Sequence, residues 1–207
     1  MIHVFHGFLG SPEDFAFLRS QGDVVLHDLY DMNEIKIQQE DTLIGYSMGG
    51  RIALELAHKN NYQFKKLVLM NAHPGLPSPS TERTIWEDSV IERLQCLSPE
   101  EFLAYWNKLP LFKGDAPIHS ISLERYKKSL KLFETHRLSK QTCFLPDLKT
   151  HHSKILSLSG IKDEKYAQIA RDLISPTGVK CLFLNAGHRI FQNQSELISV
   201  LKSENVL

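Results

Sequence analysis

Cysteine is scarce in this sequence, and neither sign of charge is in excess. The three cysteines, at positions 96, 143 and 181, are odd in number and widely spaced, which argues against a disulfide framework and fits no metal-ligand pattern. Lys and Arg total 24, as do Asp and Glu, so no long-range field attracts nucleic acid or an anionic membrane. We therefore expect no nucleic-acid partner, no membrane partner, no metal and no cofactor, and a few local cations would have to hold any anionic ligand.

Long hydrophobic runs and a targeting leader are also lacking. The chain opens directly into Ile2-His3-Val4-Phe5, and no apolar run approaches the ~20 residues that a membrane-spanning helix needs. Together with the few cysteines, this predicts a soluble, cytoplasmic protein. The 207 residues fit one domain, residues 1–207, which we expect to be a monomer or a weak homo-oligomer.

What the sequence does contain is an alternation of short apolar runs with amphipathic segments. Runs that predict strands lie at 1–5, 23–27, 41–44, 66–70, 154–158 and 179–184, and helices are predicted from Ser11-Pro12 onward and over 51–59, 164–173 and 195–202. Strands that alternate with helices imply parallel pairing through crossover connections. We therefore predict an α/β fold with one mostly parallel sheet of about six strands and helices on both faces.

Between residues 74 and 150 the alternation stops. No apolar strand run occurs there, and three segments, 82–97, 99–106 and 123–135, have the periodicity of amphipathic helices. The second begins with Ser98-Pro99-Glu100-Glu101, a capping box with proline at the first helical position. We predict that residues 74–150 form a helical lid inserted within the single domain.

The sequence Gly-Tyr-Ser-Met-Gly at positions 45–49 fits Gly-x-Ser-x-Gly, a turn between a strand and a helix that exposes one hydroxyl. It follows the strand run at 41–44 and precedes the helical pattern at 51–59, which is the setting that the motif requires. Glycines are needed because the sharp bend leaves no room for Cβ atoms, and Gly50 extends that clearance. Ser47 is therefore the candidate catalytic residue, against the alternative of an ordinary loop.

A serine hydroxyl reacts readily only when an imidazole takes its proton and a carboxylate orients that imidazole. Asp163 follows the strand run at 154–158 and His188 follows the run at 179–184, which gives the order Ser, Asp, His that this motif requires. All three would lie at the carboxyl ends of parallel strands, at one edge of the sheet. Alternatively, Asp163 only caps a helix and His188 is a surface residue, and Glu164 is the fallback carboxylate.

A negative charge that develops during a reaction needs backbone N–H donors. In sites of this kind they come from the residue after the serine and from the loop after the first strand, here Met48 and Phe8. The pair His6-Gly7 would let that loop approach closely, although it also suits a plain turn.

These motifs, together with Gly160-x-x-Asp163 and Gly187-His188, resemble the α/β-hydrolase superfamily across nearly the whole chain. Within it, the chain resembles the 2-succinyl-6-hydroxy-2,4-cyclohexadiene-1-carboxylate synthases of menaquinone (vitamin K2) biosynthesis. The residues that carry this second resemblance are Arg51 directly after the two glycines, His73-Pro74-Gly75-Leu76, Glu82-Arg83, Trp106 and Leu109-Pro110-Leu111-Phe112.

The resemblance implies a lyase on a hydrolase fold, which eliminates pyruvate from 2-succinyl-5-enolpyruvyl-6-hydroxy-3-cyclohexene-1-carboxylate without an acyl-enzyme. Ser47 would act as the base, kept reactive by His188 and Asp163, while the amides of Met48 and Phe8 would stabilise the anion. This small anionic metabolite carries several carboxylates, which call for arginine forks.

By the same resemblance, Arg51 and Arg83 match the family's substrate-binding arginines. Lys131 falls near the position of a third, with Arg137 close by, and a lysine there keeps the charge but loses bidentate geometry. Without the resemblance, Arg51 would be read as a solvent-facing helix residue and Arg83 as a partner of Glu87 four residues on.

Three aromatic residues, Tyr46, Trp106 and Phe112, are candidates to shape the substrate pocket, although they also suit simple packing. The chain departs from the family at its N-terminus, which is shortened because it begins at what would be the family's third strand. The loop after Leu29 also lacks the family's Gly-x-Gly turn.

Two other functions stay open. A small serine carboxylesterase or thioesterase would use Ser47 as a nucleophile and would need no arginines around the acyl site. A binding protein without activity would be indicated by the loss of a residue of the catalytic set, but all three are present.

Overall fold

The computed structural model describes residues 1–32 and 35–207. Within them, six strands form one sheet in the order β2-β1-β3-β4-β5-β6, and every neighbouring pair is parallel. The strands are β1 Ile2–Phe5, β2 Val24–His27, β3 Thr42–Tyr46, β4 Lys66–Met70, β5 Ile155–Gly160 and β6 Lys180–Leu184. The prediction of a six-stranded parallel α/β sheet is confirmed.

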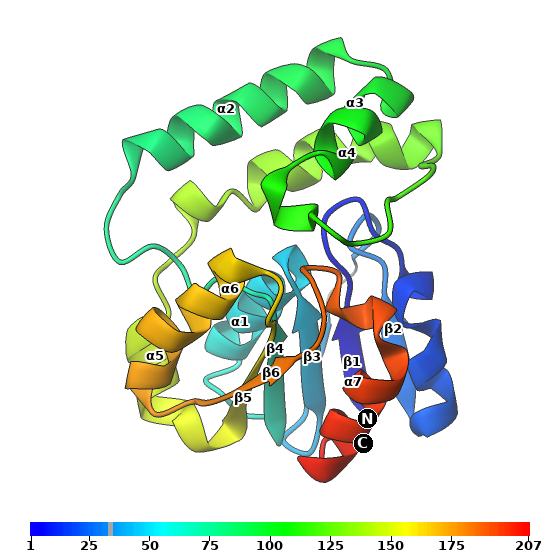
Figure 1. The fold of residues 1–207 in the computed structure, drawn as a ribbon. Coiled ribbons are helices and arrows are strands. Elements are labelled where there is room, and N and C mark those ends of the chain that lie inside the picture. The colour runs from blue at the N-terminus through cyan, green and yellow to red at the C-terminus, as the bar shows by residue number, and fades with distance from the viewer. Residues whose placement is uncertain (33–34) are drawn as a thin grey trace.

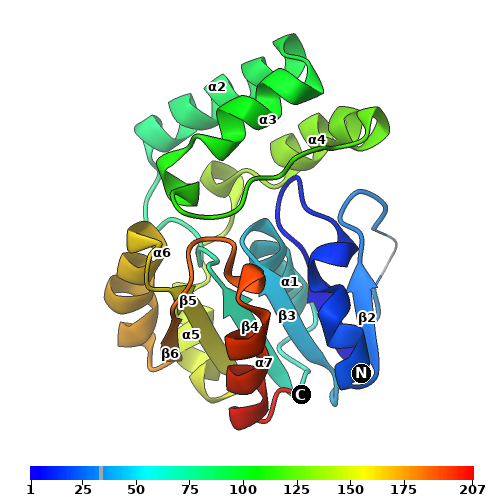
Figure 2. The same cartoon turned by 45° about the vertical axis from the view of Figure 1, so that its right-hand side comes forward.

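Helices cover both faces of the sheet (Figures 1 and 2). On one face lie α1 Met48–Lys59, α5 Leu145–His151 and α6 Glu164–Ile169, and on the other lie the 3₁₀ helix Pro12–Gln21 and α7 Gln194–Ser203. Successive strand side chains point to opposite faces, so Leu67 packs in the core beside α1 and Val68 in the core beside α7. Burial on both faces explains why the strands read as continuous apolar runs.

Three helices form a layer over the carboxyl ends of the strands (Figures 1 and 2). They are α2 Thr81–Cys96, α3 Pro99–Asn107 and α4 Leu123–Thr135. A serine precedes each helix, and its hydroxyl accepts a hydrogen bond from the third helical residue's N–H, which fixes where the helix begins. This layer is the predicted helical lid, and its extension over residues 74–150 of a single domain stays a prediction.

Four local expectations need correction. The segment Pro12–Gln21 is a 3₁₀ helix, α5 was not predicted, and α6 passes at Ile169 into a π-helical turn over Ala170–Ile174. The sequence also offers Asn193 as a cap for α7, but its side chain accepts no capping hydrogen bond, and its Nδ2 donates to Glu196. No helix among the described residues combines the length and apolar character needed to cross a bilayer.

Candidate active site

Ser47 lies in the bend between β3 and α1, at the sheet edge that faces the lid. Its backbone has φ +53° and ψ −113°, and its N–H donates to the Met70 carbonyl at 2.8 Å. A Cβ at Gly49 would lie 2.3 Å from the carbonyl oxygens of both Phe5 and His6. The bend is therefore strained at the serine and closely packed on its far side, as the motif predicts.

His188 joins Ser47 to Asp163. The Ser47 Oγ lies 3.1 Å from His188 Nε2, and His188 Nδ1 lies 2.6 Å from Asp163 Oδ2. His188 and Asp163 are 1% and 3% exposed, so their contact is shielded from water. With the Nδ1 proton donated to the carboxylate, Nε2 is free to accept the serine proton, and the arrangement can produce a reactive serine oxygen.

The second oxygen of Asp163 accepts a hydrogen bond from the N–H of Tyr166 at 3.2 Å. Asp163 therefore caps α6 and contacts His188 at the same time, so the two interpretations of this residue are compatible. Glu164 is not needed as a fallback carboxylate.

The amides of Phe8 and Met48 are the predicted oxyanion donors. Met48 is the first residue of α1, so its N–H has no partner within the helix, and among the described residues neither amide donates a hydrogen bond. The loop of Phe8 passes close to the serine, because a Cβ at Gly7 would lie 2.6 Å from the Tyr46 ring. Their role in stabilising an anion stays a prediction.

A cavity of about 760 Å³ opens beside Ser47 between the sheet and the lid; we call it the cationic cavity. Its lining includes Ser47, Met48 and Trp86, and it holds five basic residues, Arg51, Arg83, Lys113, Lys162 and Lys165. Burial, followed by the positive charge of Arg83, lowers the pKa of Lys165 from its ordinary value. The cavity has five basic residues against three acidic ones, Glu82, Asp163 and Glu164, and this excess of positive charge beside a serine favours an anionic ligand.

Arg51 is buried under the lid and does not face solvent. Its Nη1 donates to the His136 carbonyl at 2.6 Å and to Gln141 Oε1 at 3.3 Å, whereas its Nε and Nη2 have no protein partner among the described residues. Burial lowers the pKa of its guanidinium to about 10. Two of its nitrogen atoms therefore stay available to a ligand.

Arg83 contacts both Glu87 and the cavity. Its Nε donates to Glu87 Oε1 at 2.8 Å, as the i,i+4 spacing allows, and its guanidinium lies 4.5 Å from the centre of the Trp86 ring. Both Nη atoms are without a protein partner among the described residues. The ion pair thus orients Arg83 while leaving a fork for a carboxylate.

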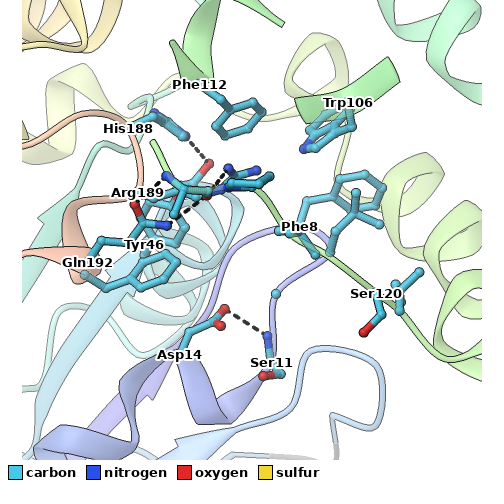
Figure 3. Close-up of a pocket in the computed structure, with 18 of the residues that line it drawn as sticks. Phe8, Ser11, Asp14, Tyr46, Trp106, Phe112, Ser120, His188, Arg189 and Gln192 are labelled. Atoms are coloured by element: carbon cyan, nitrogen blue, oxygen red, sulfur yellow. Dashed lines mark hydrogen bonds between the residues drawn. The ribbon is translucent and has the colours of Figure 1, made fainter. Parts of the chain in front are cut away.

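A second cavity, of about 330 Å³, lies on another side of Ser47; we call it the Arg125 cavity (Figure 3). Tyr46, Phe112, His188 and Arg125 contribute to its lining, and Ser47, Phe8 and Trp106 line both cavities. The Phe112 ring lies 5.4 Å from the His188 ring, and so does that of Tyr46. The three predicted aromatics thus surround the reactive groups.

The indole of Trp106 has an unused hydrogen-bond donor. Trp106 is 6% exposed, and its Nε1 is buried without a partner among the described residues. Such a group is costly unless a ligand or water accepts its hydrogen.

Lys131 is the one predicted binding residue that the structure places elsewhere. It is exposed on α4 and lines neither cavity, while the neighbouring Arg137 is bound to Glu87 and Asp88. One residue along a helix turns the side chain by about 100°, so an approximate register is insufficient to place a cation.

Sequence reasoning missed five basic residues around Ser47: Lys162, Lys165, Lys113, Arg125 and Arg189. The first two flank Asp163, so the parallel sheet that places Asp163 also predicts them near the site. Arg189 follows His188 for the same reason. Arg125 carried no such signal, because its place depends on how the lid packs.

Comparison with known proteins agrees with this geometry. The family described as alpha/beta hydrolase fold matches residues 21–91. The structure superimposes on that of MenH from S. aureus with a TM-score of 0.81 and 26% sequence identity, over 99% of this chain and 94% of that one. The chain is therefore an enzyme of the α/β-hydrolase fold, with a parallel sheet and a helical lid.

The curated relatives of the chain have a more specific name than the family does. It is similar to the 2-succinyl-6-hydroxy-2,4-cyclohexadiene-1-carboxylate synthase of Serratia proteamaculans, at 27% identity over 81% of this chain and 78% of that protein. It is also similar to the putative enzyme of that name from Bacillus subtilis, at 26% identity over 95% and 77%. A thermophilic esterase from Thermogutta terrifontis, 17% identical with a TM-score of 0.65, shares the fold.

Proposed function

We propose that this chain is a carbon–oxygen lyase that eliminates pyruvate from 2-succinyl-5-enolpyruvyl-6-hydroxy-3-cyclohexene-1-carboxylate. The product would be 2-succinyl-6-hydroxy-2,4-cyclohexadiene-1-carboxylate, an intermediate of menaquinone synthesis, formed in the cytoplasm. One observation carries the proposal: the serine that contacts His188 opens onto a cavity with five basic residues. The names of the similar synthases support the same reaction.

In the proposed reaction, Ser47 gives its proton to His188 Nε2 and then removes a proton from the substrate ring. The electrons of that C–H bond form a ring double bond as the C–O bond breaks, and enolpyruvate leaves, takes up the proton held on His188 Nε2 and becomes pyruvate. Asp163 stabilises the imidazolium that forms meanwhile. The amides of Phe8 and Met48 stabilise the transient anion.

The free nitrogen atoms of the two arginines support a polyanionic substrate. Arg51 and Arg83 are each held on the protein side through a single nitrogen atom, which leaves planar donor pairs that match carboxylates. A neutral ester would leave the buried Arg51 without a counterion, at a cost in free energy.

The test is pyruvate release from the enzymatically generated precursor, coupled to NADH oxidation by lactate dehydrogenase. Wild-type protein is expected to release pyruvate, and Ser47→Ala to fold normally with less than about a thousandth of that rate. Ser157→Ala, a change of another buried serine on β5, is the matched control and should stay active. A Ser47→Ala variant with more than about a tenth of the wild-type rate would contradict the assignment.

The second candidate is a serine carboxylesterase or thioesterase, favoured by the same serine, histidine and aspartate with two unpaired amides beside them among the described residues. Ser47 would then attack a carbonyl carbon and form an acyl-enzyme. Cleavage of a short p-nitrophenyl ester that depends on Ser47, with no pyruvate release from the precursor, would favour this function over the first.

A further inference from the structure

Asn71 is a buried residue directly after β4. It is 1% exposed and has a φ of +45°, a conformation that asparagine tolerates better than most residues. In the sheet, β4 lies between β3, which leads to Ser47, and β5, which leads to Asp163. Asn71 is therefore placed where the catalytic segments converge.

The side chain of Asn71 connects two of these segments. Its Oδ1 accepts a hydrogen bond from the Gly160 N–H at 3.0 Å, and its Nδ2 donates to the carbonyls of His188 at 2.7 Å and Gly187 at 3.2 Å. These partners fix which end of the amide is oxygen, because an N–H needs an acceptor and carbonyls need a donor. One planar amide thus links the last residue of β5, where the loop that carries Asp163 begins, to the loop after β6.

The backbone of residues 70 and 71 contacts the third catalytic segment, which is the bend that contains Ser47. The Ser47 N–H donates to the carbonyl of Met70, and the N–H of Asn71 donates to the Leu158 carbonyl at 2.9 Å. Residues 70 and 71 therefore contact the chain at or near all three members of the catalytic set. A shift of the His188 backbone would change its distances to both Ser47 and Asp163, which are 3.1 and 2.6 Å.

The two loops also contact each other without Asn71. A Cβ at Gly160 would lie 2.1 Å from the Gly187 carbonyl oxygen, and the Lys162 N–H donates to the Ala186 carbonyl at 3.0 Å. Loss of the Asn71 side chain should therefore leave the loops adjacent, while it frees the backbone of His188 and leaves its buried carbonyl with one partner fewer.

We propose that Asn71 is a positioning residue that sets His188 between Ser47 and Asp163. This inference rests on the proposed catalytic role of those three residues, whichever substrate they act on. The amide accepts on one side and donates on the other in the same plane, whereas an ionised carboxylate lacks the donor and an aliphatic side chain lacks both.

The first test is Asn71→Gly, because glycine adopts a φ of +45° without strain. Asn61→Gly is the matched control, since Asn61 has a φ of +49° and is exposed. Asn71→Gly is expected to lower kcat for pyruvate release by about 100-fold with KM changed less than about threefold, and the control to match wild type. Asn71→Gly with more than about half of the wild-type kcat would overturn the proposal.

Labelling of Ser47 by a small neutral fluorophosphonate separates this proposal from the proposed function. The labelling rate should fall in parallel in Asn71→Gly, because it depends on His188 and not on the arginines. If wild-type protein is labelled but releases no pyruvate, the lyase function fails while the role of Asn71 is still tested. Equal labelling of Asn71→Gly and wild type would refute that role.

A second variant, Asn71→Asp, distinguishes positioning from a general loss of structure. The new side chain, when ionised, would still accept from Gly160 but would repel the two carbonyls, whereas in its protonated form it could donate to them; burial raises the pKa of such a carboxyl. The ratio of the variant's kcat to that of wild type is therefore expected to rise as the pH is lowered from about 8 to about 6. A ratio that stays constant over this range would overturn the proposal.

Discussion

Glu87 on α2 is a buried carboxylate whose removal should destabilise the lid. It is 0% exposed and accepts hydrogen bonds from Arg83 Nε at 2.8 Å, Arg137 Nε at 3.3 Å and the Leu138 N–H at 2.8 Å, and from the N–H and hydroxyl of Ser139. Glu87→Ala would leave the Arg83 guanidinium and two backbone amides without their acceptor, while Arg137 would keep only its contacts with Thr84 and Asp88.

Removal of one partner from a buried ion pair costs about 3–5 kcal/mol, which sets the expected loss in the free energy of unfolding. For a chain of this size each 1 kcal/mol lowers the Tm by about 2–4 °C, so we expect a decrease of about 10 °C. Urea and thermal unfolding followed by circular dichroism would measure both values. Glu92→Ala, an exposed change on the same helix, is the control and should cost less than about 0.5 kcal/mol.

The stabilisation by Glu87 should change with pH in one direction, which follows from the pKa of its carboxyl. Burial acts to raise the pKa of Glu87, but the hydrogen bond from Ser139 and the charge of Arg83 outweigh it, so the pKa lies below its ordinary value. The stabilisation is therefore present above the carboxyl's unfolded pKa and is lost as the pH falls through its folded pKa. A loss below about 1 kcal/mol at neutral pH, or a difference from wild type that does not shrink in acid, would refute the reasoning.

Other predictions concern the cavity, the buried histidines and the loop before the lid. Arg51→Ala should raise KM for the anionic precursor about tenfold or more while hydrolysis of a neutral ester changes little, and Lys131→Ala should change neither in steady-state kinetics. Burial lowers the pKa values of His73 and His136 to about 4, so wild-type Tm should fall as the pH drops from about 6.5 towards 4, and His73→Asn should flatten that profile. Gly75 has a φ of +99°, so Gly75→Ala should lower the free energy of unfolding by more than about 1 kcal/mol in urea titrations.

The sequence was sufficient to predict the sheet and the positions of Ser47, Asp163 and His188 at one edge of it. Buried parallel strands are short apolar runs, so β4 was predicted with its observed bounds, Lys66–Met70. The site followed from topology, because Ser47, Asp163 and His188 each come after a strand and parallel strands end at one edge.

The sequence predicted that the lid is helical, but not which side chains of its helices face the site. The bounds of α4 match the prediction, because Ser122 caps the helix and its apolar positions have a clear period. The prediction that Lys131 on α4 faces the site was wrong, and Arg125, which lines a cavity beside Ser47, was missed. Helix packing depends on contacts between distant segments, which local patterns do not contain.

The path of the chain through the lid also has a consequence for the order of folding. Strands β1 to β4 are complete at Met70, whereas β5 begins only at Ile155, so the pairing of β4 with β5 joins regions far apart in sequence. Such pairing forms slowly, because the entropy of closing a long loop is lost before the contacts offset it. Ser47 lies before this junction and Asp163 lies after it. Enzymatic activity should therefore be the last property to return on refolding, and two fragments cleaved between α2 and α3 should be active only when mixed.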